Sequence, residues 1–334
     1  MKDFIKNVFA NIVAILLIGI VLFGFIVLFF VASAMSGDQK PYVDSNSVLT
    51  LNFNGNVIDS YTEKEESIFD FGQNKDVLLL DVVNAINNAK KDEKIKGISI
   101  EVDNLPAGIT QVDDIRAAIE DFKKSGKFVY AYGNNMSQKS YYLASVADKV
   151  YLNPVGMIEL KGMSTEVTFL KDFAAKYGIG VDVIRHGKFK AAVEPFIRND
   201  ISPENKEQLS TLLNDIWGNI STKIKASRKL DDATFKTAVD SLYGFMPELV
   251  VKNKLADQLL QKSEYENLIK KQLKLKSDEK INRISVNKYI NALDEEESSD
   301  NKIAVLYAAG EIFNGDEYQN IHSEKYVKYI KDLA

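Results

Sequence analysis

The first strong pattern in the chain is an uncharged apolar run at residues 12–34, rich in Ile, Leu, Val and Phe. At about 1.5 Å per residue, a helix of this length crosses a hydrocarbon core of roughly 30 Å. Lys2 and Lys6 precede the run, and positive charge marks the cytoplasmic side of a first span. The pattern predicts a cytoplasmic N-terminus at residues 1–10, a transmembrane anchor at 11–35 and an extracytoplasmic body. The alternative is a cleaved signal peptide with Ala32-Ser33-Ala34 as its cleavage site, but the run exceeds the usual apolar length of such peptides.

After a polar tether at residues 36–46, short strands and amphipathic helices alternate as far as residue 200. Apolar patterning predicts strands at 48–53, 57–58, 98–102, 128–132, 150–152 and 181–184, and helices at 79–89, 112–122, 141–147 and 164–177. Strands that alternate with helices predict α/β layers with mostly parallel pairing. The short helices and frequent small strands favour a spiral arrangement over a regular doubly wound sheet. We therefore expect one α/β unit over residues 47–200.

The region 201–293 reads as a helical extension. Ser202-Pro203-Glu204 is a typical helix start, with Ser as N-cap, Pro at the first position and an acidic residue in the first turn. Apolar residues from Leu209 to Ile224 predict one long helix with a buried stripe that includes Trp217. Further helices are expected at 232–240, 247–260 and 262–275, and the acidic run at 294–301 is typical of a solvated linker.

Residues 303–314 repeat the pattern of residues 48–59. In both copies an apolar strand, a glycine (Gly55, Gly310), a second strand and a polar stretch follow in the same order. A helix is expected to begin near Tyr326. One strand pair and a partial helix cannot close a core, so we interpret residues 302–334 as the start of a second, truncated unit in a longer tandem protein. The alternative is a short chain whose last segment packs on the first unit.

Composition narrows the chemistry. The chain has no cysteine and only two histidines, His186 and His322, which excludes thiol nucleophiles and Cys-ligated metals and disfavours a histidine metal site. The net charge of −5 gives no electrostatic case for nucleic-acid binding. We therefore expect no cofactor, no metal and no nucleic-acid partner.

Two motifs carry a family resemblance. One runs from Ser137-Gln-Lys-Ser-Tyr-Tyr to Pro154, and the more specific one is Gly187-Lys-Phe-Lys190-Ala-Ala-Val-Glu194-Pro-Phe, followed by Asp200 and Ser-Pro. Both resemble the long form of the signal peptide peptidase A family (SppA, protease IV; peptidase family S49). The resemblance extends over nearly the whole chain, from the apolar run through the acidic linker to the start of the repeat.

The resemblance implies a Clp protease/crotonase-like fold, a spiral of short sheets with outer helices, in two tandem repeats behind one membrane anchor. Family members are serine endopeptidases with a Ser/Lys dyad that degrade signal peptides left in the membrane after secretion. The implied location is the inner (cytoplasmic) membrane, with the body in the periplasm. The implied partners are signal peptides and other membrane-released peptides, the membrane, and further copies in a ring-like homotetramer. The first repeat supplies the lysine and the second the serine, from neighbouring subunits.

By position, the resemblance places the dyad lysine at Lys190. The residue types support a base there, because apolar neighbours (Phe189 and residues 191–193) would desolvate the amine, and burial disfavours its charged form. A neutral amine can accept the proton of a serine hydroxyl. Without the motif, Lys190 would read as a solvated surface lysine. Lys188 is the local competitor, and His186 is assigned a turn or structural role.

The position of the nucleophile in this first repeat holds Gln138, which cannot attack a carbonyl, and the flanking Ser137 and Ser140 do not match it. Residues 105–108 stand where the family has its oxyanion loop. We therefore expect a degenerate protease unit that keeps the lysine, a nucleophile beyond residue 334, and no peptidase activity from these 334 residues alone. The alternatives are a non-catalytic assembly subunit and, in another class, a crotonase-like acyl-CoA enzyme. Extracytoplasmic placement disfavours the last, because CoA thioesters are cytoplasmic.

Overall fold

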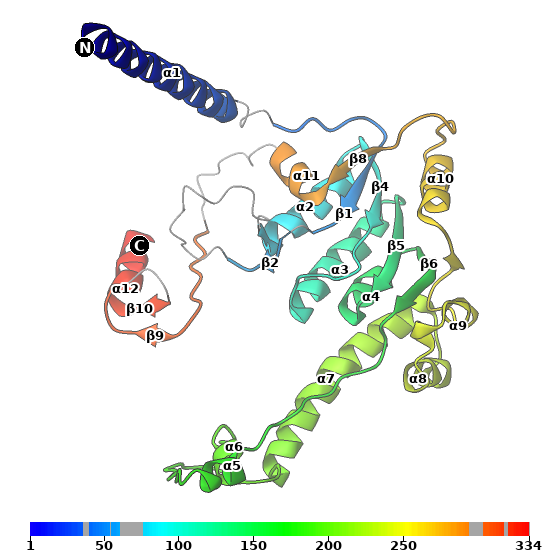
Figure 1. The fold of residues 1–334 in the computed structure, drawn as a ribbon. Coiled ribbons are helices and arrows are strands. Elements are labelled where there is room, and N and C mark those ends of the chain that lie inside the picture. The colour runs from blue at the N-terminus through cyan, green and yellow to red at the C-terminus, as the bar shows by residue number, and fades with distance from the viewer. Residues whose placement is uncertain (36–39, 54, 61–75, 294–302, 317–319, 334) are drawn as a thin grey trace. The chain divides into compact units, whose positions relative to one another are not determined.

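The computed structural model describes residues 1–35, 40–53, 55–60, 76–293, 303–316 and 320–333, drawn in colour in Figure 1. The chain divides into two compact units, Met1–Tyr42 and Val43–Ala334. Part of the expected tether (36–39) and all of the expected acidic linker (294–301) lie outside the described residues.

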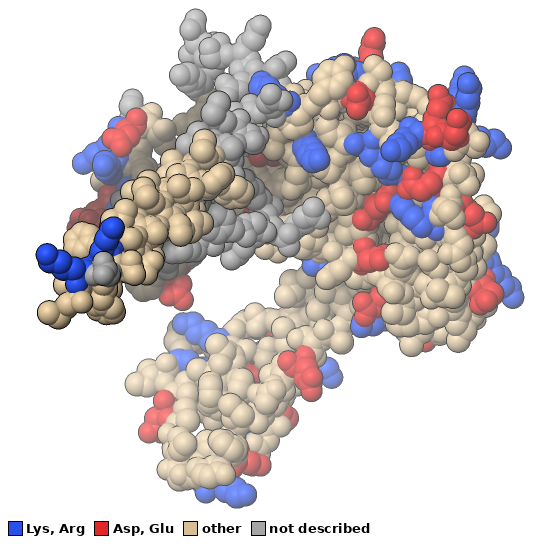
Figure 2. Space-filling model, turned by 45° about the horizontal axis from the view of Figure 1, so that its top comes forward, with Lys and Arg blue, Asp and Glu red and all other residues tan. Residues whose placement is uncertain are grey.

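The first unit is dominated by helix α1 (Lys2–Met35). Its segment Phe4–Phe29 has a mean hydropathy of 3.3, and it is the one helix in the described part of the chain that is long and apolar enough to cross a membrane. Figure 2 shows its surface without charged side chains along most of its length, with basic side chains gathered at one end. The predicted anchor is therefore a helix, although it begins earlier than residue 11 and takes in most of the expected cytoplasmic segment.

The second unit contains a six-stranded sheet in the order β7–β6–β5–β4–β1–β8, in which neighbouring strands are parallel. The strands are β1 (Ser47–Leu51), β4 (Ile95–Ile100), β5 (Phe128–Met136), β6 (Lys149–Ile158), β7 (Gln258–Leu259) and β8 (Asn282–Ser285). Helices α2 (Leu79–Lys91), α3 (Ile109–Lys123) and α4 (Gln138–Ala144) separate the successive central strands. The expected α/β class, parallel strands with outer helices, is confirmed (Figure 1).

Alternation along the strands builds two apolar layers. In β5, Val129 and Ala131 face a core that also contains buried residues of α2, α3 and α4, whereas Phe128 and Tyr132 face the opposite side. There they pack with Tyr265 of α10 (Lys262–Gln272), whose ring stacks on Tyr132 at a centroid distance of 4.9 Å. Successive side chains of a strand point to opposite faces. The alternation of aromatic and small apolar residues in β5 therefore places the aromatic side chains in one layer and the small ones in the other.

The helical extension begins as expected with α7 (Pro203–Arg228), where the Ser202 hydroxyl accepts a hydrogen bond from Asn205 N at 3.1 Å. The expected fully buried stripe is wrong for the first half of this helix. Ile220 and Ile224 are buried, but Leu212 is 55% exposed, because in this chain the packing surface covers the second half of α7.

The rest of the extension contains α8 (Asp232–Asp240), a 3₁₀ turn (Tyr243–Phe245), α9 (Pro247–Lys252) and α11 (Val286–Ala292). The helix expected at 247–260 ends at Lys252. Residues 258–259 instead pair with β6 as strand β7, so tertiary pairing outweighs local helical patterning there.

The repeated sequence segments share part of their local structure. The first strand expected in the second copy is wrong, because residues 303–309 form no strand where the first copy has β1. β2 (Val57–Ile58) pairs in parallel with β3 (Val77–Leu78) immediately before α2, and β9 (Ile312–Phe313) pairs in parallel with β10 (Ile321–His322) immediately before α12 (Ser323–Leu333). In α2 the apolar residues Val82, Ile86 and Ala89 are buried, whereas Val327, Ile330 and Leu333 of α12 are exposed.

Candidate active site residues

The segment that carries Lys190 has little regular structure. Between β6 and α7 the helices are α5 (Lys171–Lys176) and the single turn α6 (Glu194–Ile197). The helix predicted at 164–177 is reduced to α5, and the strand predicted at 181–184 is wrong because these residues form no strand. The physical reason is that, within the described part of the chain, Val181 and Ile184 pair with no strand and join no core cluster, and both side chains are exposed. We call residues 161–200 the lysine arm.

Lys190 is exposed in this chain. It lies on the rim of an open hollow of about 780 Å³, lined by residues 184–186 and 189–193. Arg185 Nη1 donates a hydrogen bond to the backbone oxygen of Lys190 at 2.7 Å, which fixes the turn between them. The competing side chains Lys188 and His186 are exposed as well. The apolar surroundings expected around the amine are thus present in the sequence, but within the described residues this chain does not enclose them.

The carboxylate of Glu194 is one of the few buried groups of the lysine arm. Its Oε2 atom accepts hydrogen bonds from Ser202 N at 3.3 Å and from Asn205 Nδ2 at 3.1 Å, at the start of α7. Hydrogen bonds from Ser202 and Asn205 lower the pKa of Glu194, although partial desolvation opposes them.

Gln138, at the position the resemblance assigns to the nucleophile, is the first residue of α4. Its side-chain oxygen accepts hydrogen bonds from Lys161 N and Gly162 N, both at 3.0 Å, and its side-chain nitrogen donates to Gly162 O at 3.0 Å. The amide therefore makes three of its four possible hydrogen bonds to the backbone that leaves β6. At this position the chain has a side chain that binds the backbone of residues 161–162, in place of a nucleophile.

The two neighbouring serines are also engaged. Ser137 caps α4, and its hydroxyl lies 2.9 Å from that of Ser140. Ser140 is buried, and its hydroxyl accepts a hydrogen bond from Leu105 N at 2.9 Å. Neither hydroxyl contacts a histidine, lysine or carboxylate that could remove its proton, among the hydrogen bonds of the described residues.

Backbone donors of the loop at the oxyanion position are occupied too. Leu105 N binds Ser140, Ala107 N binds Leu105 O at 2.9 Å, and Gly108 N binds the side chain of Gln111 at 2.7 Å. An oxyanion hole needs N–H groups that point at a reacting oxygen. With these three backbone donors satisfied internally, residues 105–108 offer no free pair of N–H groups to a reacting oxygen.

Sequence reasoning missed the anchoring of α7. Asp113 of α3 accepts hydrogen bonds from Lys223 Nζ at 2.8 Å and Asn219 Nδ2 at 2.7 Å, both on α7, and from the Tyr142 hydroxyl of α4. Burial opposes ionisation of Asp113, but these donors outweigh it and lower its pKa. Arg116, one turn further along α3, is also buried against α4 and α7. The sequence did contain a signal for this anchoring. Arg116 lies at the helical spacing of the buried apolar residues of α3, where a charged residue needs a partner.

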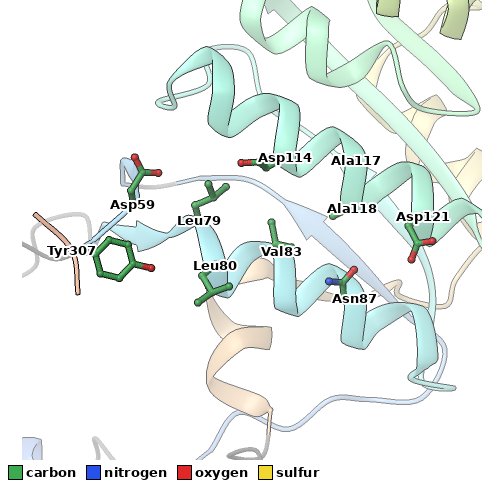
Figure 3. Close-up of a pocket in the computed structure, with 10 residues that line it drawn as sticks. All are labelled: Asp59, Leu79, Leu80, Val83, Asn87, Asp114, Ala117, Ala118, Asp121 and Tyr307. Carbon is green, nitrogen blue, oxygen red and sulfur yellow. The ribbon is translucent and has the colours of Figure 1, made fainter. Parts of the chain in front are cut away.

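A second hollow, of about 690 Å³, lies between α2 and α3. Figure 3 shows the carboxylates of Asp59, Asp114 and Asp121 around its edge, with Leu79 and Val83 between them. Its lining within the described residues contains no serine, lysine or histidine, so it offers no nucleophile–base pair.

Comparisons with known proteins bear on this arrangement. The profile of peptidase family S49 matches residues 121–276, which include α4, the lysine arm and α7. Protease 4 of Haemophilus influenzae is 30% identical over 320 residues, covering 90% of this chain and 52% of that protein. Protease 4 of Salmonella typhi is 33% identical over 275 residues, covering 78% of this chain and 44% of that protein.

A chloroplastic serine protease SPPA of Arabidopsis thaliana is 34% identical over 177 residues, covering 53% of this chain and 25% of that protein. Among solved structures, Pseudomonas aeruginosa DspI aligns with 59% of this chain and 70% of its own at 10% identity and a TM-score of 0.34, a likeness too slight to carry an argument. The chain spans about half the length of the Protease 4 relatives it matches. By these sequence matches, residues 121–276 contain a domain of peptidase family S49, and the chain is a relative of the Protease 4 and SPPA proteins.

Proposed function

We propose that this chain is the lysine-bearing part of a membrane-anchored serine endopeptidase that degrades signal peptides left in the membrane. Lys190 is its general base, and the serine nucleophile lies outside residues 1–334. One observation carries the proposal. In the α/β unit, the position assigned to the nucleophile holds Gln138, whose amide binds backbone, while the lysine arm presents Lys190 on an exposed apolar surface that another protein surface would cover.

The proposed chemistry depends on a partner surface that buries the apolar side chains around Lys190. Ile184 and Phe189 are exposed beside Lys190, and their burial against a partner surface would also desolvate the amine. Desolvation lowers the pKa of a lysine, so that a neutral amine is available near neutral pH. The neutral amine takes the serine proton as the hydroxyl attacks the peptide carbonyl, and the ammonium then protonates the leaving amine. No cofactor enters these steps.

The anchor and the arm support the proposed location and partners. The apolar helix α1 holds the body next to a bilayer, where apolar signal peptides remain after cleavage. Lys2 and Lys6 at its start favour a cytoplasmic N-terminus in the inner membrane and an extracytoplasmic body. The exposed apolar side chains of the lysine arm favour self-association, for which the resemblance implies a homotetramer.

The test compares Lys190→Ala with Lys188→Ala in the full-length protein in mild detergent, with a fluorogenic peptide and a synthetic signal peptide as substrates. Lys188 is a matched control because it is a lysine two residues away that is also exposed. We expect loss of cleavage in Lys190→Ala and near-parental cleavage in Lys188→Ala. Cleavage that survives in Lys190→Ala contradicts the assignment of the base. A full-length parent that cleaves neither substrate favours the alternative, a non-catalytic assembly subunit.

A further inference from the structure

One buried carboxylate joins the part of the lysine arm that carries Lys190 to the start of α7. Glu194 lies four residues after Lys190 and is 1% exposed, in an arm where Ala174 is the other buried residue. Most side chains of the arm are exposed, so packing contributes little to its conformation.

Glu194 contacts the start of α7 directly. Its Oε2 atom accepts from Ser202 N and Asn205 Nδ2, and the Ser202 hydroxyl in turn accepts from Asn205 N at 3.1 Å. Negative charge is favourable at the N-terminus of a helix, where backbone N–H groups lack partners. Removing the carboxylate leaves the Asn205 amide and Ser202 N–H unpaired in a buried place.

The other end of α7 is fixed to the α/β unit. Asn219 and Lys223 bind Asp113 of α3, so contacts run from the unit through α7 to Glu194 and on to the turn that carries Lys190. The helix is a rigid element, and at about 1.5 Å per residue its 26 residues extend over about 39 Å. Displacement at its tip therefore moves the lysine.

We propose that Glu194 is a positioning residue for Lys190, holding the arm on the tip of α7 so that the amine meets the nucleophile in a fixed place. This inference rests on the proposed function, in which Lys190 is the base. A base must lie within hydrogen-bond reach of the proton it removes, and a displacement of about 1 Å costs roughly a hundredfold in rate.

The test uses the full-length protein with Glu194→Ala, Glu194→Gln and the control Glu166→Ala, a glutamate of the same arm whose side chain is exposed. Glutamine keeps an oxygen acceptor for Ser202 and Asn205. We expect kcat to fall about 10- to 100-fold in Glu194→Ala, with KM within about twofold, and to recover to within about fivefold in Glu194→Gln. The displaced, less desolvated amine should also shift the acid limb of the kcat profile to higher pH.

If Glu194→Ala does not fold, Asn205→Ala replaces it, because that change removes one of the two partners and keeps the carboxylate. Its fall in kcat should be in the same direction and smaller. Either variant behaving like Glu166→Ala overturns the proposal, as does a fall in kcat with no recovery in Glu194→Gln. Lys190→Ala, run in parallel, separates the two ideas. Activity in that variant refutes the lysine base, whereas its inactivity beside a fully active Glu194→Ala refutes positioning alone.

Discussion

Replacing Arg116 by alanine should loosen α7 from the α/β unit. The buried guanidinium donates hydrogen bonds to Tyr142 O, to Ser145 Oγ at 2.8 Å and to Ser227 Oγ at 2.9 Å. It also lies over the ring of Tyr142 at 4.5 Å from the centroid. These contacts tie α3 to α4 and to the last turn of α7, so one side chain holds three helices together.

The magnitude follows from the number and kind of contacts. Three hydrogen bonds from a charged donor, at about 1.5–3 kcal/mol each, would sum to about 4.5–9 kcal/mol. Desolvation of the guanidinium and its buried, unpartnered Nε atom offset part of this sum. We expect Arg116→Ala to lower the free energy of unfolding by about 3–5 kcal/mol. Arg116→Met should cost less than about 2 kcal/mol, because it fills the space and Ser145 Oγ still binds Tyr142 O.

Urea unfolding in mild detergent, followed by the fluorescence of Trp217, measures this difference. Trp217 is the single tryptophan of the chain, and its ring lies on α7, stacked on Phe235 at a centroid distance of 6.0 Å. Lys124→Ala is the control, since that side chain is 73% exposed and its ion pair with Asp121 should contribute under about 1 kcal/mol. The reasoning is refuted if Arg116→Ala costs no more than Lys124→Ala, or if methionine is as damaging as alanine.

Two further predictions concern Gln138 and Asp113. Gln138→Ala should lower the free energy of unfolding by about 1–3 kcal/mol, because the side chain binds backbone. Peptide cleavage by the full-length protein should stay within about threefold of the parent, because the side chain takes no part in the chemistry. A large loss of kcat without loss of stability would contradict this prediction. Asp113 has a folded-state pKa below its ordinary 3.8, so its contribution to stability is present above about pH 3.8 and is lost as pH falls further. Urea unfolding between pH 5 and pH 2.5 should therefore show a shallower decline for Asp113→Asn than for the parent, while Asp114→Asn, an exposed neighbour, should decline as the parent does.

The elements that sequence patterning predicted well are those whose partners lie inside this chain. The α2 pattern and the small-then-aromatic alternation of β5 each match a layer that the same chain supplies. The strand expected at 181–184 failed for the opposite reason. Apolar residues such as Ile184 indicate that a face is covered, but they do not say what covers it, and no strand among the described residues pairs with them.

At the candidate site, too, the sequence predicted some features and missed others. The motif around Lys190 placed that residue by resemblance, and its predicted desolvation is not met within this chain. The hydrogen bonds that Gln138 and Glu194 make could not be predicted from the spacing of residues in the sequence. Both depend on backbone or side chains 8 to 24 residues away, which meet only when the sheet and α7 are in place.

The most direct measurement of the central claim is to locate the serine that an activity-based fluorophosphonate probe modifies in the full-length protein. Our account predicts modification of a serine outside residues 1–334, at a rate that collapses in Lys190→Ala and persists in Lys188→Ala. Modification of Ser137, Ser140 or any other serine of these 334 residues, or an unchanged rate in Lys190→Ala, would contradict it.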